Sequence, residues 1–415
     1  MKRRRALALL AAASAGVAAC AAAPAPAGAA PMPPAGVTLG DEVFLREAWR
    51  DLRGRRAGIV TNQTGVTSRL ETTVDAIRRN PEIALRAIYA PEHGFRGDRP
   101  AGAYVPSYTD PQTNLPVYSL YGATRHPGAA MLSGVDVLLF DIQDVGDRAY
   151  TYISTLAYVM QAARETQKEV WVLDRPNPLG GDIVEGPVLD PRFSSFIGLY
   201  PLALRHGLTV GELARMYDER FKIGCTLRVI AMEGYRRSML WPDTGLAWVQ
   251  TSPNIPDWRT ALLYPATGLI DGAGLNNGTG FTKPFAYAGA FGLDAFKLAE
   301  FLNARPIPGV HFRAASWSPL AGLWAGKTLS GVELIVVDRR AYRAVRTAVE
   351  ILVAVRTLAP SVLSFRDGAG LDKDWGTDTL RLGLQGGLDV EAILRQWTAA
   401  TGEFAAARQP YLLYD

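Results

Sequence analysis

Short runs of apolar residues recur along the first part of the chain, and segments long enough to form a helix separate them. Continuous apolar runs are typical of strands that are buried on both faces of a sheet. We expect such strands at residues 56–60, 85–89, 115–120, 135–140, 170–173 and 227–232. Helical patterns at 155–166 and 210–221 favour a parallel sheet covered by helices. The sequence therefore predicts an α/β fold with a Rossmann-like first domain over residues 38–240.

The pattern changes after residue 250. Prolines and a glycine-rich run over 268–280 come first, and helical patterns at 294–304, 342–357 and 390–400 follow, with a strand pattern at 332–337. Helices that are segregated from strands are typical of an α+β domain. We expect a smaller α+β C-terminal domain over residues 250–415 that completes a cleft with the first domain, because clefts are common at domain interfaces.

Residues 1–19 have the order of an export signal: basic residues, an alanine- and leucine-rich stretch, then small residues. Cys20 follows these small residues as in a bacterial lipobox, so we expect a lipidated Cys20; cleavage near residues 27–29 by an ordinary signal peptidase is the alternative. Residues 20–37 are mainly alanine, proline and glycine, and they predict a disordered tether. We expect a periplasmic or cell-envelope lipoprotein that contacts the membrane through its lipid anchor only.

Charge and the missing motifs narrow the possible functions. Residues 1–19 hold four basic and no acidic side chains, so their removal lowers the formal net charge from +4 to zero. Nucleic-acid binding needs a surplus of basic residues, and none remains. The chain also lacks G-x-G-x-x-G, H-E-x-x-H, paired C-x-x-C and G-x-S-x-G motifs. We therefore expect no nucleic-acid partner, no nucleotide or other cofactor, and no metal.

Polar residues follow the second expected strand directly. Pro91, Glu92, His93 and Gly94 form a turn there, and Arg96 comes next. Open α/β sheets bind ligands at the carboxyl ends of their strands, so this turn is a candidate for chemistry. If it has no chemical role, Glu92 caps a helix and His93 only forms a hydrogen bond within its loop.

Six segments in this order resemble the NamZ-type family of bacterial exo-β-N-acetylmuramidases. They lie at residues 58–65, 91–94, 140–152, 174–178, 185–187 and 252–256. The resemblance covers nearly all of the chain after its signal. It implies an exo-acting glycoside hydrolase that releases β-linked N-acetylmuramic acid from the non-reducing end of peptidoglycan fragments, as in cell-wall recycling.

Glycoside hydrolysis generally uses one acid and a second carboxylate. Glu92 is our expected acid, with His93 orienting it. Asp141 and Asp144, which flank Gln143 at a strand end, are expected as the second catalytic group, and Glu185 is a weaker candidate. Asp141 also suits a capping role in its turn, and Glu185 also suits an exposed turn.

Arg148, Tyr150 and Tyr152 alternate along the chain, so an extended backbone places them on one side. Tyrosines stack on sugar faces, and an arginine fork binds a carboxylate. Alternatively, the tyrosines simply begin the next helix. The complete set of expected substrate-binding residues is Asn62, Gln63, Arg96, Gln143, Arg148, Tyr150, Tyr152, Glu185, Asp271 and Lys283.

One segment departs from the family pattern. Relatives typically have E-G-T-N-x-S-x-G-R-G-T where residues 271–281 read D-G-A-G-L-N-N-G-T-G-F, so Asp271 shortens the acid and Thr279 replaces the arginine. If that arginine holds the lactyl carboxylate in relatives, Lys283 or Arg148 must serve here. This change keeps one alternative open, a hydrolase of another N-acetylated sugar. A second alternative, a non-catalytic muropeptide-binding lipoprotein, applies if the catalytic pair is incomplete.

Overall fold

The computed structural model describes residues 36–365 and 369–415. The expected signal, the lipidation site Cys20 and most of the expected tether lie outside these residues. Val37, at the end of that tether, is buried against Met232 and Tyr235, so the folded region already includes it. By their contacts, the described residues form one compact unit.

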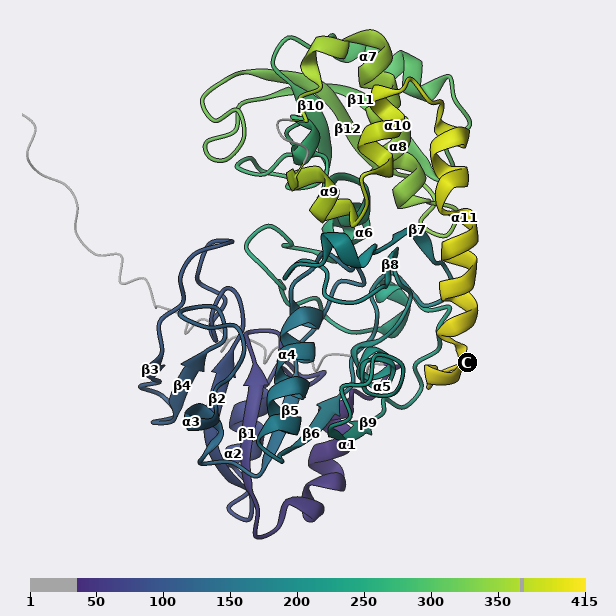
Figure 1. The fold of residues 1–415 in the computed structure, drawn as a ribbon. Coiled ribbons are helices and arrows are strands. Elements are labelled where there is room, and N and C mark those ends of the chain that lie inside the picture. Colours follow the sequence, from purple (N-terminus) through teal and green to yellow (C-terminus); the bar gives the residue numbers. More distant parts are fainter. Residues whose placement is uncertain (1–35, 366–368) are drawn as a thin grey trace, which may run out of the picture. The chain divides into compact units, whose positions relative to one another are not determined.

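A seven-stranded sheet forms the centre of the N-terminal region, in the order β3-β4-β2-β1-β5-β6-β9 (Figure 1). Its strands are β1 (Arg56–Thr61), β2 (Ala84–Ala90), β3 (Tyr108–Thr109), β4 (Pro116–Ser119), β5 (Val137–Asp141), β6 (Glu169–Leu173) and β9 (Thr226–Ile230). Neighbouring strands are parallel except β3 and β4 at one edge. Every residue of β5 is buried, as its continuous apolar run predicts. The expected α/β fold is confirmed.

Helices cover both faces of this sheet, and successive strand residues point to opposite faces. Ile59 belongs to one hydrophobic cluster and Val60 to another. The α-helices of this region are α1 (Gly40–Arg46), α2 (Thr73–Arg78), α3 (Ala129–Leu132), α4 (Tyr152–Glu165) and α5 (Val210–Glu219). Short 3-10 helices η1 (Ala48–Leu52), η2 (Pro191–Phe193) and η3 (Trp241–Thr244) and a hairpin of β7 (Glu185–Val188) and β8 (Ala203–Arg205) complete it. Thr209 and Glu212 form a capping box that starts α5.

The C-terminal region has a three-stranded antiparallel sheet in the order β10-β12-β11. Its strands are β10 (Tyr287–Ala290), β11 (Val310–Trp317) and β12 (Leu329–Val336). The helices are α6 (Trp258–Thr267), η4 (Asp271–Ala273), α7 (Ala295–Asn303), α8 (Ala344–Leu358), η5 (Pro360–Val362), α9 (Ala369–Trp375), α10 (Thr379–Gln385), α11 (Val390–Ala407) and η6 (Gln409–Tyr411). Within the described ranges, no helix has both the length and the apolar character needed to cross a membrane.

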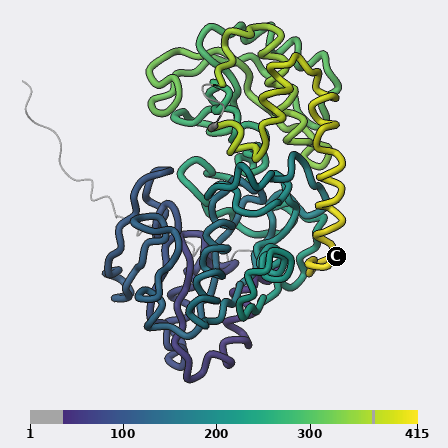
Figure 2. Tube along the Cα trace, in the orientation of Figure 1, coloured from purple at the N-terminus to yellow at the C-terminus, as the bar shows by residue number. Residues whose placement is uncertain are grey.

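The end of the chain returns to the N-terminal region, as the yellow end of the trace in Figure 2 shows. Tyr414 donates a hydrogen bond from its hydroxyl to Asp174 at 2.6 Å, directly after β6. The backbone N–H of Arg237 donates to the carbonyl of Asp415 at 2.7 Å. These contacts tie the residues after the last helix to the carboxyl edge of the parallel sheet.

A buried ion triad holds that edge together. Arg175, which follows β6, donates from Nε to Asp141 at 2.6 Å and from Nη2 to Asp41 at 3.2 Å. All three side chains are almost entirely excluded from solvent. Burial raises the pKa of Asp41, and the charge of Arg175 opposes this rise. The triad therefore links α1, β5 and the end of β6 through charges that water does not reach.

We expect Arg175→Ala to lower the free energy of unfolding by about 3–5 kcal/mol, because it leaves two buried carboxylates without a cation. Urea unfolding at pH 7 measures this change. Arg55→Ala is the control: it breaks a partly exposed pair with Glu169, and such pairs contribute about 0–1 kcal/mol. Equal losses for the two variants would show that the triad does not stabilise the fold.

Candidate active site

The turn after β2 places Glu92 and His93 at the carboxyl edge of the sheet. The N–H of Gly94 donates to the carbonyl of Pro91 at 3.0 Å and closes the turn. His93 has a positive φ of 70°, a conformation that costs energy in a residue with a side chain. Its Nδ1 lies 2.8 Å from the carbonyl of Arg99. Because a carbonyl only accepts, Nδ1 must carry the proton.

Glu92 is buried and accepts a hydrogen bond on each carboxyl oxygen. The N–H of Gly102 donates to Oε1 at 2.9 Å, and the hydroxyl of Thr151 donates to Oε2 at 2.8 Å. We expected His93 to orient Glu92, and in the structure Nδ1 of His93 forms its hydrogen bond with the carbonyl of Arg99, in the loop that leads to Gly102. His93 therefore orients Glu92 through that loop.

The donors Gly102 and Thr151 differ in whether they tolerate a proton on the carboxyl oxygen that they contact. The backbone N–H of Gly102 can only donate, so it favours Oε1 as the oxygen that carries no proton. The hydroxyl of Thr151 can donate or accept, so it tolerates a proton on Oε2. The geometry therefore assigns Oε2 as the oxygen that holds the proton whenever Glu92 is an acid.

Two tyrosines form a buried wall beside Glu92. The hydroxyls of Tyr150 and Tyr152 donate to the side chain and the carbonyl of Thr251, at 2.9 and 2.6 Å. Their rings meet edge to face, 4.9 Å apart. Burial raises the pKa of Tyr152 strongly, and the charges of Tyr150 and Glu92 add to this rise. Tyr152 is also the first residue of α4, so it both begins the helix and lines the site.

Residues after β1 hold the Thr251 segment from the other side. The side-chain amide of Gln63 donates to the carbonyls of Gln250 and Thr251 at 2.8 and 3.0 Å. Asn62 accepts from Thr64, and its own Nδ2 is buried without a partner among the described residues. Unpaired buried polar atoms are rare in folded proteins and need a reason, such as a bound substrate or water.

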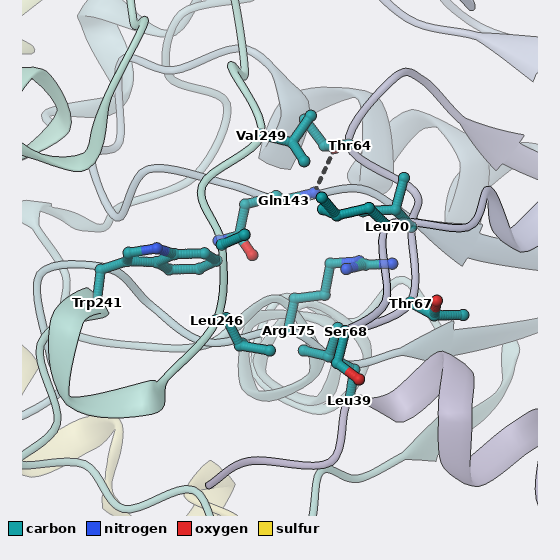
Figure 3. Close-up of a pocket in the computed structure, with 12 residues that line it drawn as sticks. Leu39, Thr64, Thr67, Ser68, Leu70, Gln143, Arg175, Trp241, Leu246 and Val249 are labelled. Atoms are coloured by element: carbon teal, nitrogen blue, oxygen red, sulfur yellow. Dashed lines mark hydrogen bonds between the residues drawn. The ribbon is translucent and has the colours of Figure 1, made fainter. Parts of the chain in front are cut away.

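Gln143 and Arg175 line a small cavity, shown in Figure 3. Its volume is about 20 Å³, which is room for one water and not for a sugar. The backbone N–H of Gln143 donates a hydrogen bond to the hydroxyl oxygen of Thr64 at 2.9 Å, and the side chain of Gln143 donates to the carbonyl of Pro176. Gln143 therefore stabilises the loop after β5.

Asp141 and Asp144 flank Gln143, yet their surroundings differ. Asp141 is held by Arg175, whereas Asp144 has no Arg or Lys ion pair among the residues described. Burial raises the pKa of Asp144 to about 7. His206 lies 4.0 Å from it, and burial lowers the pKa of this imidazole to about 3, so it is neutral at pH 7. Asp144 is thus a protonatable carboxyl near the tyrosine wall.

Arg148 lies wholly inside the protein. Its Nη2 donates to the carbonyl of Asp374 in α9 at 3.2 Å, while Nε and Nη1 find no partner in the described part of the chain. Gly198 and Gly376 lie against the guanidinium, and a Cβ at either would come within 2.8 Å of Nη1. Burial lowers the pKa of Arg148 to about 10 and raises that of Asp374 to about 7. Arg148 therefore connects the N- and C-terminal regions.

The structure leaves several expected residues outside this group. Arg96 pairs with Asp110 at 2.9 Å, and Glu185 pairs with Arg205 at 3.0 Å. Lys283 lines a separate groove of about 610 Å³ between α6 and β12. The residues that gather along the tyrosine wall and the loop after β5 are Asn62, Gln63, Glu92, Gln143, Asp144, Tyr150 and Tyr152.

Lys283 also pairs with Glu333 at 2.6 Å. Asp271 lies in η4, and its charge contributes to the raised pKa of Asp374. We expected Lys283 or Arg148 to bind a substrate carboxylate. In the structure, Lys283 is ion-paired with Glu333 and Arg148 is buried.

Three residues of the site escaped sequence reasoning. Gly102 acts through its backbone and carries no chemical signal. Thr151 lies between the two tyrosines, and Thr251 directly precedes the 252–256 segment. These positions were the only indication in the sequence that the two threonines belong to the site. Across the described ranges, no group of three or more His, Cys, Asp or Glu residues is placed to hold a metal ion.

Two family models match the chain, one over residues 57–259 and the other over 262–414. They describe the N-terminal and C-terminal parts of the exo-β-N-acetylmuramidase NamZ. This chain belongs to the NamZ family. The two models meet within α6, which spans Trp258–Thr267.

Relatives of this NamZ family chain agree in sequence and in fold. Peptidoglycan β-N-acetylmuramidase NamZ of Bacillus subtilis is 43% identical over 378 residues, which is 91% of either chain. The crystal structure of a DUF1343 family protein from Bacteroides fragilis has a TM-score of 0.86 and 36% identity, covering 92% of this chain and 100% of the other. A second protein of that family and organism has a TM-score of 0.73 and 28% identity, covering 91% and 99%.

The pKa of Asp147 gives a pH-dependent prediction for this NamZ family protein. Burial raises that pKa to about 7, so between about pH 4 and pH 7 the folded state binds a proton that the unfolded state releases. Its contribution to the free energy of unfolding therefore falls as the pH rises through this window. Asp147→Asn keeps the acceptor for the N–H of Ala149 and removes the titration.

We expect Asp147→Asn to match the parent near pH 4 and to exceed its unfolding free energy at pH 7.5, by an amount on the order of a few kcal/mol. Urea unfolding at both pH values measures the difference. Asp136→Asn is the control, and its effect on the unfolding free energy should have the opposite sign, because the hydrogen bonds from Arg56 lower the pKa of Asp136. A constant difference for Asp147→Asn at both pH values would show that Asp147 does not titrate as described.

Proposed function

We propose that this chain is an exo-acting glycoside hydrolase that releases β-linked N-acetylmuramic acid from the non-reducing end of peptidoglycan fragments. The proposal rests on family membership over both halves of the chain and on 43% identity to a peptidoglycan β-N-acetylmuramidase. The observation that ties this activity to a site is the carboxyl group of Glu92, held on both oxygens at the carboxyl edge of the sheet.

Glu92 is the proposed general acid. Expulsion of a sugar alkoxide needs a proton on the glycosidic oxygen. The proton on Oε2 passes to that oxygen while the hydroxyl of Thr151 returns to its role as a donor. Gly102 keeps Oε1 in place during the transfer, so the carboxyl group does not rotate away from the substrate.

Asp144 is the proposed second carboxylate. Asp141 and Glu185 each hold a guanidinium, whereas Asp144 retains Oδ1 without a partner in the described protein. As nucleophile or as base, this group acts in its ionised form. Since burial raises the pKa of Asp144 to about 7, its active form accumulates as the pH rises through that value.

Glu92→Gln keeps the size of the side chain and removes the acidic proton. We expect it to reduce turnover of a muramic-acid-containing disaccharide by about 10² to 10⁴, the usual contribution of a positioned acid. An aryl N-acetylmuraminide has a better leaving group and should lose less. Steady-state kinetics on both substrates, with Asp98→Asn as an exposed control on the same loop, measures the contrast.

Equal losses for both leaving groups, together with weaker sugar binding, would make Glu92 a binding residue and return the search for the acid to Asp144. An unchanged variant would remove Glu92 from the site. Tight muropeptide binding by the parent without turnover of either substrate would indicate a binding lipoprotein in place of a hydrolase.

We also propose that the protein is exported and anchored through a lipid on Cys20. The support is the basic, apolar and small-residue order of residues 1–19 and the flexible composition that follows. These residues lie outside the described part of the chain, so the proposal stands on sequence.

Intact-mass analysis of protein extracted from its native membrane should show an acylated mature chain that begins at Cys20. Cys20→Ala should abolish the acyl mass and release the protein from the membrane fraction or leave the signal uncleaved. An unmodified mature chain that begins after Ala29 would contradict lipidation.

A further inference from the structure

Three aromatic rings and an arginine form a wall beside Glu92. Tyr121 follows β4, Phe196 lies between β7 and β8, and Tyr158 lies on α4. The Phe196 ring is 5.8 Å from the Tyr121 ring and is stacked on Tyr158 at 5.9 Å. The exposed guanidinium of Arg125 lies over Tyr121 at 4.7 Å and over Phe196 at 4.5 Å.

Backbone hydrogen bonds fix this wall to the Glu92 turn. The N–H of Leu120 donates to the carbonyl of Ala90 at 2.8 Å, two residues before Glu92. The N–H of Val105 donates to the carbonyl of Tyr121 at 3.0 Å. Burial raises the pKa of Tyr121, the charge of Glu92 adds to the rise, and Arg125 opposes it. The hydroxyl of Tyr121 thus lies within reach of both Glu92 and Arg125.

Arg125 differs from the other cations considered for the substrate. Arg96 and Lys283 are paired with carboxylates, and Arg148 is buried. In the described part of the chain, Arg125 has aromatic contacts and no ion pair. A guanidinium that lies on aromatic faces keeps its donors free and ordered for a planar carboxylate.

We propose that Arg125, held on Tyr121 and Phe196, binds the lactyl carboxylate of N-acetylmuramic acid and selects this sugar over N-acetylglucosamine. The inference rests on the proposed function and adds the residue that sets its specificity. The lactyl ether at C3 is the group that distinguishes the two sugars, and only C2 separates C3 from C1, whose glycosidic oxygen Glu92 protonates. Tyr121 lies between Glu92 and Arg125. A single sugar ring is therefore large enough to contact both the acid and the cation.

The test compares two aryl glycosides with the same leaving group, one of N-acetylmuramic acid and one of N-acetylglucosamine. Arg125→Ala removes the charge-assisted hydrogen bonds to the lactyl carboxylate. We expect this loss of binding free energy to lower kcat/KM for the muraminide by about 10- to 100-fold. Arg125→Lys should recover part of this loss. Arg192→Gln, which changes an exposed arginine beside Phe193 that is already paired with Asp190, should leave the activity unchanged.

A binding measurement keeps the test independent of turnover. Free N-acetylmuramic acid should bind the parent more tightly than N-acetylglucosamine by calorimetry, and Arg125→Ala should remove this difference. If the parent hydrolyses the muraminide and Arg125→Ala keeps the full preference for the lactyl sugar, the Arg125 inference is wrong and the proposed function stands. If the parent hydrolyses neither glycoside, the proposed function fails, and the calorimetric comparison alone decides whether Arg125 recognises the lactyl group.

Discussion

The ion triad of Arg175 with Asp41 and Asp141 is the interaction on which the functional edge of the sheet depends. Charges removed from water must be paired, so the ends of β5 and β6 and the start of α1 are constrained to one arrangement. The loop after β5 begins at Asp141 and carries Gln143 and Asp144. The position of these side chains thus follows from a pairing that itself takes no part in the proposed chemistry.

Contacts between segments that are distant in sequence assemble the rest of the site. Thr251 receives the hydroxyls of Tyr150 and Tyr152 and the amide of Gln63, so three loops share one anchor. Glu92 is held by a backbone N–H and a threonine hydroxyl. Most of these partners are neutral, which leaves the charge of Glu92 free to change during a reaction.

Arginine takes three different roles near this edge because its surroundings differ. Arg175 is buried and paired, and it stabilises the fold. Arg148 is buried, has two nitrogens without a partner among the residues that the structure describes, and connects the N- and C-terminal regions. Arg125 is exposed on aromatic rings and keeps its donors available. Burial and neighbouring charge, and not residue type, separate a structural guanidinium from one suited to bind a substrate.

The sequence by itself determined the α/β fold and the place of the Glu92 turn, because apolar runs and a proline–glycine turn are local signals. It missed β11, whose alternating burial is spread over a strand with three polar or charged residues, and β10, which is mostly small residues. Only the tertiary structure distinguished Asp141 from Asp144. Both flank Gln143 in the same way, and Arg175, which lies 34 residues beyond Asp141 in the chain, pairs with one of them. Only the tertiary structure singled out Arg125 as well. Desolvation and pairing depend on which distant segments meet, and no local sequence pattern records that.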